Sequence, residues 1–460
     1  MIPIFILIVV RIIPLITSGT PLGYDSGLYK HLFDQNQLEL INGSFDTKNW
    51  LGSMYLPGTT ILSTILLNLG YSSTFIVTYF LILLDIIVLI NLYILCKYYF
   101  TKEVALIATY LYSVSTVSFY VFSYVYYKNI LGISMLLIII YLFEKKKYFL
   151  ATLMGGLLGG IHRPSFAIFS ITFFLNWLDK KEIKLFISGI AIIIISILFY
   201  LNNVYDLFAS ILIETTMSVN RNISSGTFMD LRLFLYESLI LVMFFIIGLF
   251  YIIKKRKYNY LFIWLVLNIF LITFKIFFYN RIIIFLNVVI IIYSAVGISI
   301  LLKNLKHYQQ TMLIILIVIS TSGVIISEST NNISLISKYE YETIKLISTY
   351  TPEDSKIFYN NKYYSAWVIG WSNRTTISHG VFINNNYTQT QWNNFFNGNL
   401  SIIAQETGNK YFFIGRFGTI NKYNYDFYTS QYPINCFSEV YTNEDSTLIK
   451  YNNNCKYNIN

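Results

Sequence analysis

The chain has 460 residues, of which 55% are hydrophobic and only 12% are charged. A soluble domain carries about twice that share of charged residues, so the composition argues against a soluble protein and indicates a chain that lies mostly in a membrane. The net charge of +10 does not point to nucleic acid, because the Lys and Arg residues lie in short clusters between apolar runs, where they report on membrane orientation.

Apolar runs of membrane-spanning length recur through the first 326 residues. The first run lacks a small-residue cleavage site and is interpreted as an uncleaved span. The stretch 57–70, which follows Pro57-Gly58, is either a further span or a helix lying at the membrane interface. The expected fold is an α-helical polytopic membrane domain of about 11 to 13 transmembrane helices. The expected spans lie near 2–18, 75–96, 104–122, 129–143, 148–162, 164–178, 184–201, 233–253, 258–278, 281–302 and 309–326.

Basic residues predict the orientation of these spans, because cytoplasmic loops are enriched in Lys and Arg. The clusters fall in every second loop, and the alternation holds without exception if 57–70 does not cross. The loops 19–56 and 202–232 and the tail 327–460 are then extracytoplasmic. The clusters are Lys97/Lys102, Lys145-Lys146-Lys147, Lys180-Lys181/Lys184, Lys254-Lys255-Arg256-Lys257 and Lys303/Lys306.

The tail 327–460 differs from the transmembrane domain 1–326. It is polar, aromatic and rich in Asn, with short alternating runs at 356–359 and 410–414 that are typical of strands. We expect a small extracytoplasmic α+β domain. Cys436 and Cys455 both lie in it, on the oxidising side of the membrane, where they either form a disulfide or stay free.

The loop after the first span contains Gly23-Tyr24-Asp25-Ser26-Gly27-Leu28-Tyr29. A single carboxylate between glycines, just outside the bilayer, makes Asp25 the best candidate for a catalytic base. The alternative is a turn residue or helix cap, because the segment that follows would form an amphipathic helix well.

Positive residues at the outer ends of spans run against the positive-inside bias and need another explanation. Together, these positive residues could bind an anionic lipid head group such as a phosphate, since the planar guanidinium of Arg donates paired hydrogen bonds to phosphate oxygens. The alternative is snorkelling of each side chain to the lipid surface. His162 is either a phosphate contact or a hydrogen-bonded structural residue, and we favour the second interpretation. The candidates are Lys128, His162, Arg163, Lys275 and Arg281.

Arg11 lies in the middle of the first span, where a charge is by default a candidate functional residue. We favour a structural role instead, either pairing with Asp85 in the second full span or packing. No metal-ligand spacing, phosphate-binding loop or dinucleotide fingerprint occurs in the sequence. No cofactor is evident from the residues.

The order of these features resembles the GT-C superfamily of polytopic glycosyltransferases, which includes protein O-mannosyltransferases and the aminoarabinose transferase of lipid A. Gly23-Tyr24-Asp25 resembles the family's first outer loop with its catalytic aspartate, and Tyr55-Leu56-Pro57-Gly58 resembles its Tyr-Pro-Pro-Gly segment. Gly159-Gly160-Ile161-His162-Arg163-Pro164 is similar to a Gly-rich helix that ends in Thr-Lys-Gly, with Arg163 in place of the lysine. Tyr279-Asn280-Arg281 resembles the late Arg-Phe helix.

Two departures from the family are present. Residues 119–129 contain no acidic residue in the second outer loop, which leaves the need for a divalent metal undecided. The segment 367–374 resembles part of the oligosaccharyltransferase tail but lacks its Trp-Trp-Asp-Tyr-Gly signature, so we expect Trp367 and Trp371 to pack in a core.

The resemblance implies an inverting glycosyltransferase at the extracytoplasmic face of the cell membrane. The donor would be a polyprenyl-phosphate-linked sugar and the acceptor a glycan or protein. Asp25 would act as general base, while Arg163 and Arg281, with Lys128, Lys275, His162 and Tyr29, would bind the lipid phosphate or substrate. Two alternatives stay open. A flippase for lipid-linked sugars would show broken helices and internal repeats, and a polysaccharide ligase or polymerase would use a large outer loop.

Overall fold

The computed structural model describes residues 2–41, 57–199, 228–256, 259–276, 278–331, 334–377, 387–396, 401–416 and 436–452. The chain divides into two compact units. The first unit comprises Met1–Pro14, Tyr55–Ile65 and Tyr79–Asn332, and the second comprises Leu15–Met54, Leu66–Thr78 and Ile333–Asn460. The C-terminal tail therefore shares its compact unit with two segments from the N-terminal part of the chain.

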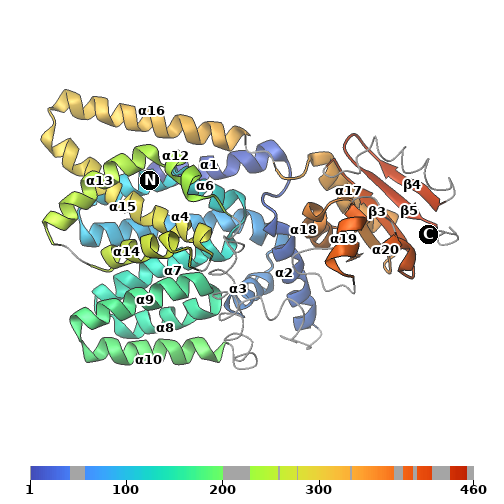
Figure 1. Cartoon of the computed structure of the whole chain (residues 1–460), viewed down its shortest axis with the longest axis horizontal. Coiled ribbons are helices and arrows are strands. Elements are labelled where there is room, and N and C mark those ends of the chain that lie inside the picture. The colour runs from blue at the N-terminus through green and yellow to red at the C-terminus, as the bar shows by residue number, and fades with distance from the viewer. Residues whose placement is uncertain are drawn as a thin grey trace. The chain divides into compact units, whose positions relative to one another are not determined.

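The first unit is built from helices (Figure 1). Three of them, α1, α3 and α4, lie only partly in this unit. The helices are α1 (Ile2–Ser18), α3 (Pro57–Asn68), α4 (Ser73–Tyr99), α5 (Lys102–Ser113), α6 (Thr116–Ser123), α7 (Tyr127–Glu144), α8 (Tyr148–Ile161), α9 (Arg163–Lys180), α10 (Ile183–Leu198), α12 (Leu231–Glu237), α13 (Leu239–Lys254), α14 (Tyr260–Thr273), α15 (Tyr279–Asn304) and α16 (His307–Asn331).

The predicted helical membrane architecture is confirmed, since every run expected to span the membrane forms a helix or two consecutive helices. In the described part of the chain, four helices (α4, α7, α15 and α16) are long and apolar enough to cross a membrane. The number rises to six if the bent pairs α5–α6 and α12–α13 each form one span, and α1, α8, α10 and α14 are apolar but shorter. The predicted boundary between residues 326 and 327 lies inside α16.

The helix α15 lies at the centre of the first unit, with 100% of its most apolar window buried in protein, against 11% for α16. So little protein contact suits α16 to face lipid. On another side of this unit, α7, α8, α9 and α10 pack as neighbours (Figure 1).

The uncertain segment 57–70 forms the short helix α3. A helix of 12 residues is about 18 Å long, well short of the roughly 30 Å hydrocarbon core of a bilayer. Helix length therefore favours the interpretation in which this segment does not cross and the alternation of basic loops is unbroken.

The predicted pair between Arg11 and Asp85 is confirmed. The Arg11 Nε donates to Asp85 Oδ2 at 2.8 Å, and both side chains are at most 1% exposed. The Tyr112 hydroxyl donates to the other carboxylate oxygen of Asp85. The guanidinium carbon lies 5.5 and 5.4 Å from the ring centroids of Phe119 and Phe122. Such a buried pair ties α1 to α4 and α5, which is a structural role.

The second unit contains a five-stranded sheet in the order β2-β1-β3-β5-β4. The strands β2, β1 and β3 are parallel, and β5 pairs antiparallel with β3 and β4. The elements are β1 (Lys356–Tyr359), β2 (Thr375–Thr376), β3 (Lys410–Ile414), β4 (Phe437–Thr442) and β5 (Thr447–Tyr451), with α2 (Asp25–Ile41), α17 (Lys338–Tyr350), the 3-10 turn η2 (Lys362–Tyr364), α18 (Ser365–Trp371), α19 (Gln389–Phe396) and α20 (Ser401–Gln405).

Alternating side chains of the central strands supply two apolar cores, one on each face of the sheet. Ile357 and Phe413 pack with residues of α17 and α18, whereas Phe358 and Phe412 pack with residues of α19 and α20. The predicted small domain of helices and strands is confirmed. Trp367 and Trp371 belong to the first core, as expected.

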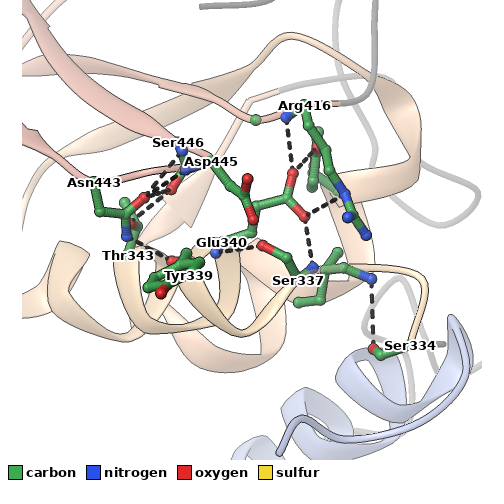
Figure 2. A network of polar contacts seen from close by, with 12 residues as sticks. Ser334, Ser337, Tyr339, Glu340, Thr343, Arg416, Asn443, Asp445 and Ser446 are labelled. Atoms are coloured by element: carbon green, nitrogen blue, oxygen red, sulfur yellow. Dashed lines mark hydrogen bonds and ion pairs between the residues drawn. The ribbon is translucent and has the colours of Figure 1, made fainter. Parts of the chain in front are cut away.

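Glu340, whose side chain is 0% exposed, fixes the start of α17 (Figure 2). It forms a capping box with Ser337, in which each side chain accepts a hydrogen bond from the other residue's backbone N–H. The same carboxylate accepts hydrogen bonds from the Tyr364 hydroxyl and, at 2.8 Å, from the Arg416 backbone N–H. Cys436 is buried and disulfide-bonded, while Cys455, its predicted partner, lies outside the described residues.

Candidate functional site

Asp25 is the first residue of α2, and its side chain is half-buried. The Ser26 hydroxyl donates to the Gly23 carbonyl oxygen at 2.9 Å and closes the turn before the helix. A carboxylate in the first turn also stabilises a helix through the helix dipole. Asp25 thus starts the helix that the sequence predicts, and this position is compatible with both catalysis and helix stabilisation.

The helix α2 packs closely against α18 within the second unit. A Cβ atom at Gly27 would lie 1.9 Å from the carbonyl oxygen of Ala366, so only glycine allows this approach. The Tyr24 hydroxyl is hydrogen-bonded to the Ser365 hydroxyl. Leu28 completes the contact with an apolar cluster that includes Ala366. The segment that carries Asp25 is therefore held against the C-terminal domain on both sides of the carboxylate.

Tyr29 is buried, with its ring centroid 6.0 Å from that of Phe33. It belongs to the packing of α2, and the substrate contact predicted for it stays a prediction. Lys30 pairs with Asp34 at 2.6 Å and lies 5.9 Å from the centroid of a Trp371 ring.

In the first unit, three of the predicted outer residues come together. His162, in the turn between α8 and α9, interacts electrostatically with both Lys128 and Arg281. Burial lowers the pKa of His162, and the two neighbouring positive charges lower it further. A neutral imidazole follows at physiological pH, so the positive charge here comes from Lys128 and Arg281.

The packing around His162 explains this convergence. Its Nδ1 is 2.7 Å from the Ser165 hydroxyl, and its ring stacks on Phe285 at 6.3 Å between centroids. A Cβ at Gly132 would meet the Ser165 hydroxyl at 2.3 Å and His162 Nδ1 at 3.0 Å. Gly132 lies one helical turn after Lys128, and Phe285 lies one turn after Arg281. Since residues four apart share a helix face, these contacts bring both cations to the side of His162.

The remaining candidates lie nearby in sequence or at another helix end. Arg163, half-buried, is the first residue of α9 and directly follows His162. The guanidinium of Arg281 lies 5.2 Å from the ring centroid of Tyr126, two residues before Lys128. Lys275 is exposed in the turn after α14, with a left-handed backbone at φ 53°.

Two sequence motifs also meet in the first unit. Pro57 is the first residue of α3, and the Thr59 hydroxyl donates to the Ile161 carbonyl oxygen at 3.5 Å. The segment around Pro57 is thus joined to the turn that carries His162 and Arg163.

Sequence reasoning missed the residues that build this turn, which are Thr59, Gly132, Ser165 and Phe285. A local signal was present for two of them, because Gly132 is one turn from Lys128 and Ser165 closes the His162-Arg163-Pro164-Ser165 run. Asp25 and Tyr29 belong to the second unit, whereas the outer cations and His162 belong to the first.

Among the residues that the structure describes, no group of three or more His, Cys, Asp and Glu side chains is arranged to hold a metal ion. The residues around Asp25 and around His162 do not by themselves form a metal site, and no step proposed below passes through a metal.

The fold is similar to that of the oligosaccharyltransferase of Archaeoglobus fulgidus. The apo crystal structure of that protein matches with a TM-score of 0.59 and 12% identity, covering 92% of this chain and 70% of that one. Its complex with Zn and sulfate matches with a TM-score of 0.56 and 12% identity, covering 91% and 68%.

A third structure, tethered by a disulfide to an acceptor peptide that contains the NVT sequon, matches with a TM-score of 0.57 and 11% identity, covering 92% and 70%. The chain therefore has the fold of this oligosaccharyltransferase. No family model matches this chain, and no curated protein matches its sequence.

The shared fold confirms the resemblance at the level of the fold. The likeness lies in the arrangement of helices and the C-terminal domain rather than in residues, because identity is 11 to 12%. The roles of Asp25 and of the outer cations therefore have to be argued from their own geometry.

Proposed function

We propose that this chain is a membrane glycosyltransferase that moves a sugar from a polyprenyl-phosphate-linked donor to an acceptor on the extracytoplasmic face. The observation that carries the proposal is the convergence of Lys128 and Arg281 on His162, beside Arg163, in a GT-C fold. Clustered cations at the end of membrane helices suit an anionic ligand, and a lipid-linked phosphate is one that lies at that depth.

In the proposed reaction, Asp25 accepts the proton of the acceptor hydroxyl as that oxygen attacks the anomeric carbon of the sugar. The bond between the anomeric carbon and the phosphate oxygen breaks at the same time. The electron pair leaves with the polyprenyl phosphate, and the sugar is transferred with inversion. Asp25 ends protonated and returns its proton to solvent.

Arg163 and Arg281, with Lys128 and Lys275, stabilise the charge that develops on the departing phosphate. The neutral His162 contributes position rather than charge. Its contacts with Ser165 and Phe285 hold the turn so that Arg163 is presented at the start of α9.

The packing of α2 on α18 gives Asp25 a fixed direction, because the hydrogen bond of Tyr24 and the close approach of Gly27 flank it. A catalytic carboxylate has to be held within a fraction of an ångström of its productive position. The C-terminal domain therefore serves the reaction by positioning its base. The acceptor, a glycan or a protein, would bind at the extracytoplasmic face of the membrane.

The test is a membrane assay with a panel of polyprenyl-phosphate sugars, scored for loss of donor that depends on Asp25. We expect Asp25→Asn to abolish transfer without loss of expression, since Asn keeps the size and a side-chain oxygen of Asp, and the helix-dipole interaction that it loses contributes only about 0.3 to 1 kcal/mol. Asp34→Asn, which changes a carboxylate on the same helix, should retain transfer. Retention of most of the wild-type rate by Asp25→Asn would remove Asp25 from the mechanism.

A second candidate, transport of a lipid-linked sugar across the membrane, is favoured by one observation. Two helix pairs are bent at a break, by 50° between α5 and α6 and by 87° between α12 and α13, and if each pair forms one span these are broken helices as expected of transporters. The same assay separates the two, because a transporter relocates the donor without consuming it.

A further inference from the structure

Two apolar helix pairs of the first unit are bent sharply at a break, and both breaks line one small cavity. The first break lies between α5 and α6 at Val114-Ser115, and the second lies between α12 and α13 at Ser238. The cavity has a volume of about 40 Å³. A volume of roughly 10 to 15 Å³ is enough for one water molecule, so a single ion with a water fits here.

The polar groups of this cavity are oxygen atoms. No Lys, Arg or His side chain lines it, and Glu237 supplies one carboxylate. Glu237 also interacts electrostatically with Glu328, which adds to the negative potential. The polar lining residues are Ser115, Thr116, Glu237, Ser238, Ser320 and Thr321.

Two of the lining hydroxyls already donate their protons elsewhere. The Ser320 hydroxyl donates to the Leu316 carbonyl oxygen at 2.7 Å, and the Thr321 hydroxyl donates to the Ile317 carbonyl oxygen at 2.7 Å. The Thr321 oxygen is also within hydrogen-bond distance of the Tyr110 hydroxyl, at 3.0 Å, which leaves it one lone pair. The lone pairs that remain on the two oxygens can accept from, or coordinate, whatever occupies the cavity.

Two other lining hydroxyls belong to buried residues and open to the cavity. Ser238 is 2% exposed and Thr116 is 6% exposed, and neither side chain has a hydrogen-bond partner within the described ranges of the chain. Neither oxygen is among the fully enclosed atoms, so both are available to an occupant of the cavity. Irregular backbone within a membrane domain is likewise tolerated where it lines a solvated cavity.

We propose that this cavity binds one hard monovalent cation, with Na⁺ as the probe ion. Carboxylate and hydroxyl oxygens are the ligands that hard cations prefer, and one lining carboxylate balances one positive charge. Sodium sites are formed at broken membrane helices in the same way. The ion would join α5–α6, α12–α13 and α16 and so stabilise the folded first unit.

The experiment uses the full chain in detergent micelles and compares unfolding temperatures in NaCl, KCl, CaCl₂ and choline chloride at equal ionic strength. We expect Na⁺ to raise the unfolding temperature of the wild type in a saturable manner, because a ligand that binds only the folded state stabilises it. The shift should disappear in Glu237→Gln. In Ser238→Ala, which keeps the charge, half-saturation should need about tenfold more Na⁺.

Glu103→Gln is the matched control, because Glu103 is exposed in the first turn of α5, remote from the cavity lining. It should keep the full Na⁺ shift. The proposal is wrong if the wild type shows no Na⁺ dependence, if Glu237→Gln keeps it, or if only Ca²⁺ acts. A dependence on pH alone would mean that Glu237 holds a proton instead. None of these outcomes depends on sugar transfer, so they are independent of the proposed reaction.

Discussion

The carbonyl oxygen of Gly27 would lie 2.4 Å from a Cβ atom at Gly370, and neither helix can move apart without breaking the hydrogen bond between Tyr24 and Ser365. Two glycines far apart in sequence thus let α2 and α18 cross in close contact. Because Asp25 lies two residues before Gly27, the position of its carboxylate depends on a helix of the C-terminal domain.

We predict that Gly370→Ala lowers the stability of the chain by about 1 to 3 kcal/mol, as is typical of overpacking, and reduces the turnover number of transfer. The donor KM should stay near the wild-type value, because the change displaces the base and leaves the cations in place. Thermal unfolding and donor titration measure the two effects.

Gly323→Ala is the control for that change, because a Cβ at Gly323 on α16 would meet nothing within 4 Å. It should be neutral or slightly stabilising, since alanine favours a helix over glycine. If Gly370→Ala behaved like this control, the close crossing of α2 and α18 would not matter for the site.

The second prediction concerns pH. Burial lowers the pKa of His31 to about 4 from 6.5, with Lys30 contributing and Asp34 opposing. Between these values the unfolded chain binds a proton that the folded chain does not. The contribution of His31 to the free energy of unfolding is therefore fully present above about pH 6.5. It is lost as the pH falls towards 4, and the total loss is about 3 kcal/mol.

His31→Gln should flatten the fall in unfolding temperature of the full chain between pH 6.5 and 4.5, because the substituted side chain does not titrate. His307→Gln, which changes an exposed histidine at the start of α16, should leave that fall unchanged. An equally steep pH dependence in His31→Gln would show that other groups cause it.

The third prediction tests the outer cations. Arg163→Ala and Arg281→Ala should each weaken donor binding by about 1.5 to 3 kcal/mol, the usual contribution of a charge-assisted contact. This corresponds to roughly a ten- to hundredfold rise in donor KM with little change in acceptor KM. Arg256→Ala, in a basic loop expected to be cytoplasmic, should change neither. Unchanged donor affinity in both outer variants would mean that these arginines only extend to the lipid surface and do not bind the donor.

The helices could be predicted from apolar runs, because twenty apolar residues have few stable arrangements other than a membrane helix. The two breaks could not. The run 104–122 is largely apolar, and its average hydropathy hides Ser115, which caps the start of the second helix. The core role of Trp367 followed from its size, since a large aromatic side chain in a small domain has few other places to lie.

The site was predictable in part. The depth of Lys128, Arg163 and Arg281 at span ends indicated a common plane, but not that Lys128 and Arg281 share His162 as a neighbour. That depends on Gly132 and Phe285, which lie on different helices. The contact of Gly27 with Gly370 is likewise set by tertiary packing, and no local pattern joins residues that far apart.

The last prediction concerns sidedness, on which the proposed donor depends. The basic loops, including 254–257, are expected in the cytoplasm, and Asp25, Arg163, Arg281 and the tail outside, where the available donor is carried by lipid. The opposite orientation would place Asp25 beside cytosolic nucleotide sugars. The test uses single cysteines at two exposed lysines, Lys362→Cys in the tail and Lys255→Cys in the loop, in a Cys96→Ala background that keeps Cys436 disulfide-bonded. On intact cells, an impermeant thiol reagent should label Lys362→Cys and spare Lys255→Cys, and permeabilisation should expose both. Labelling of the loop variant but not the tail variant would overturn the orientation and, with it, the lipid-linked donor.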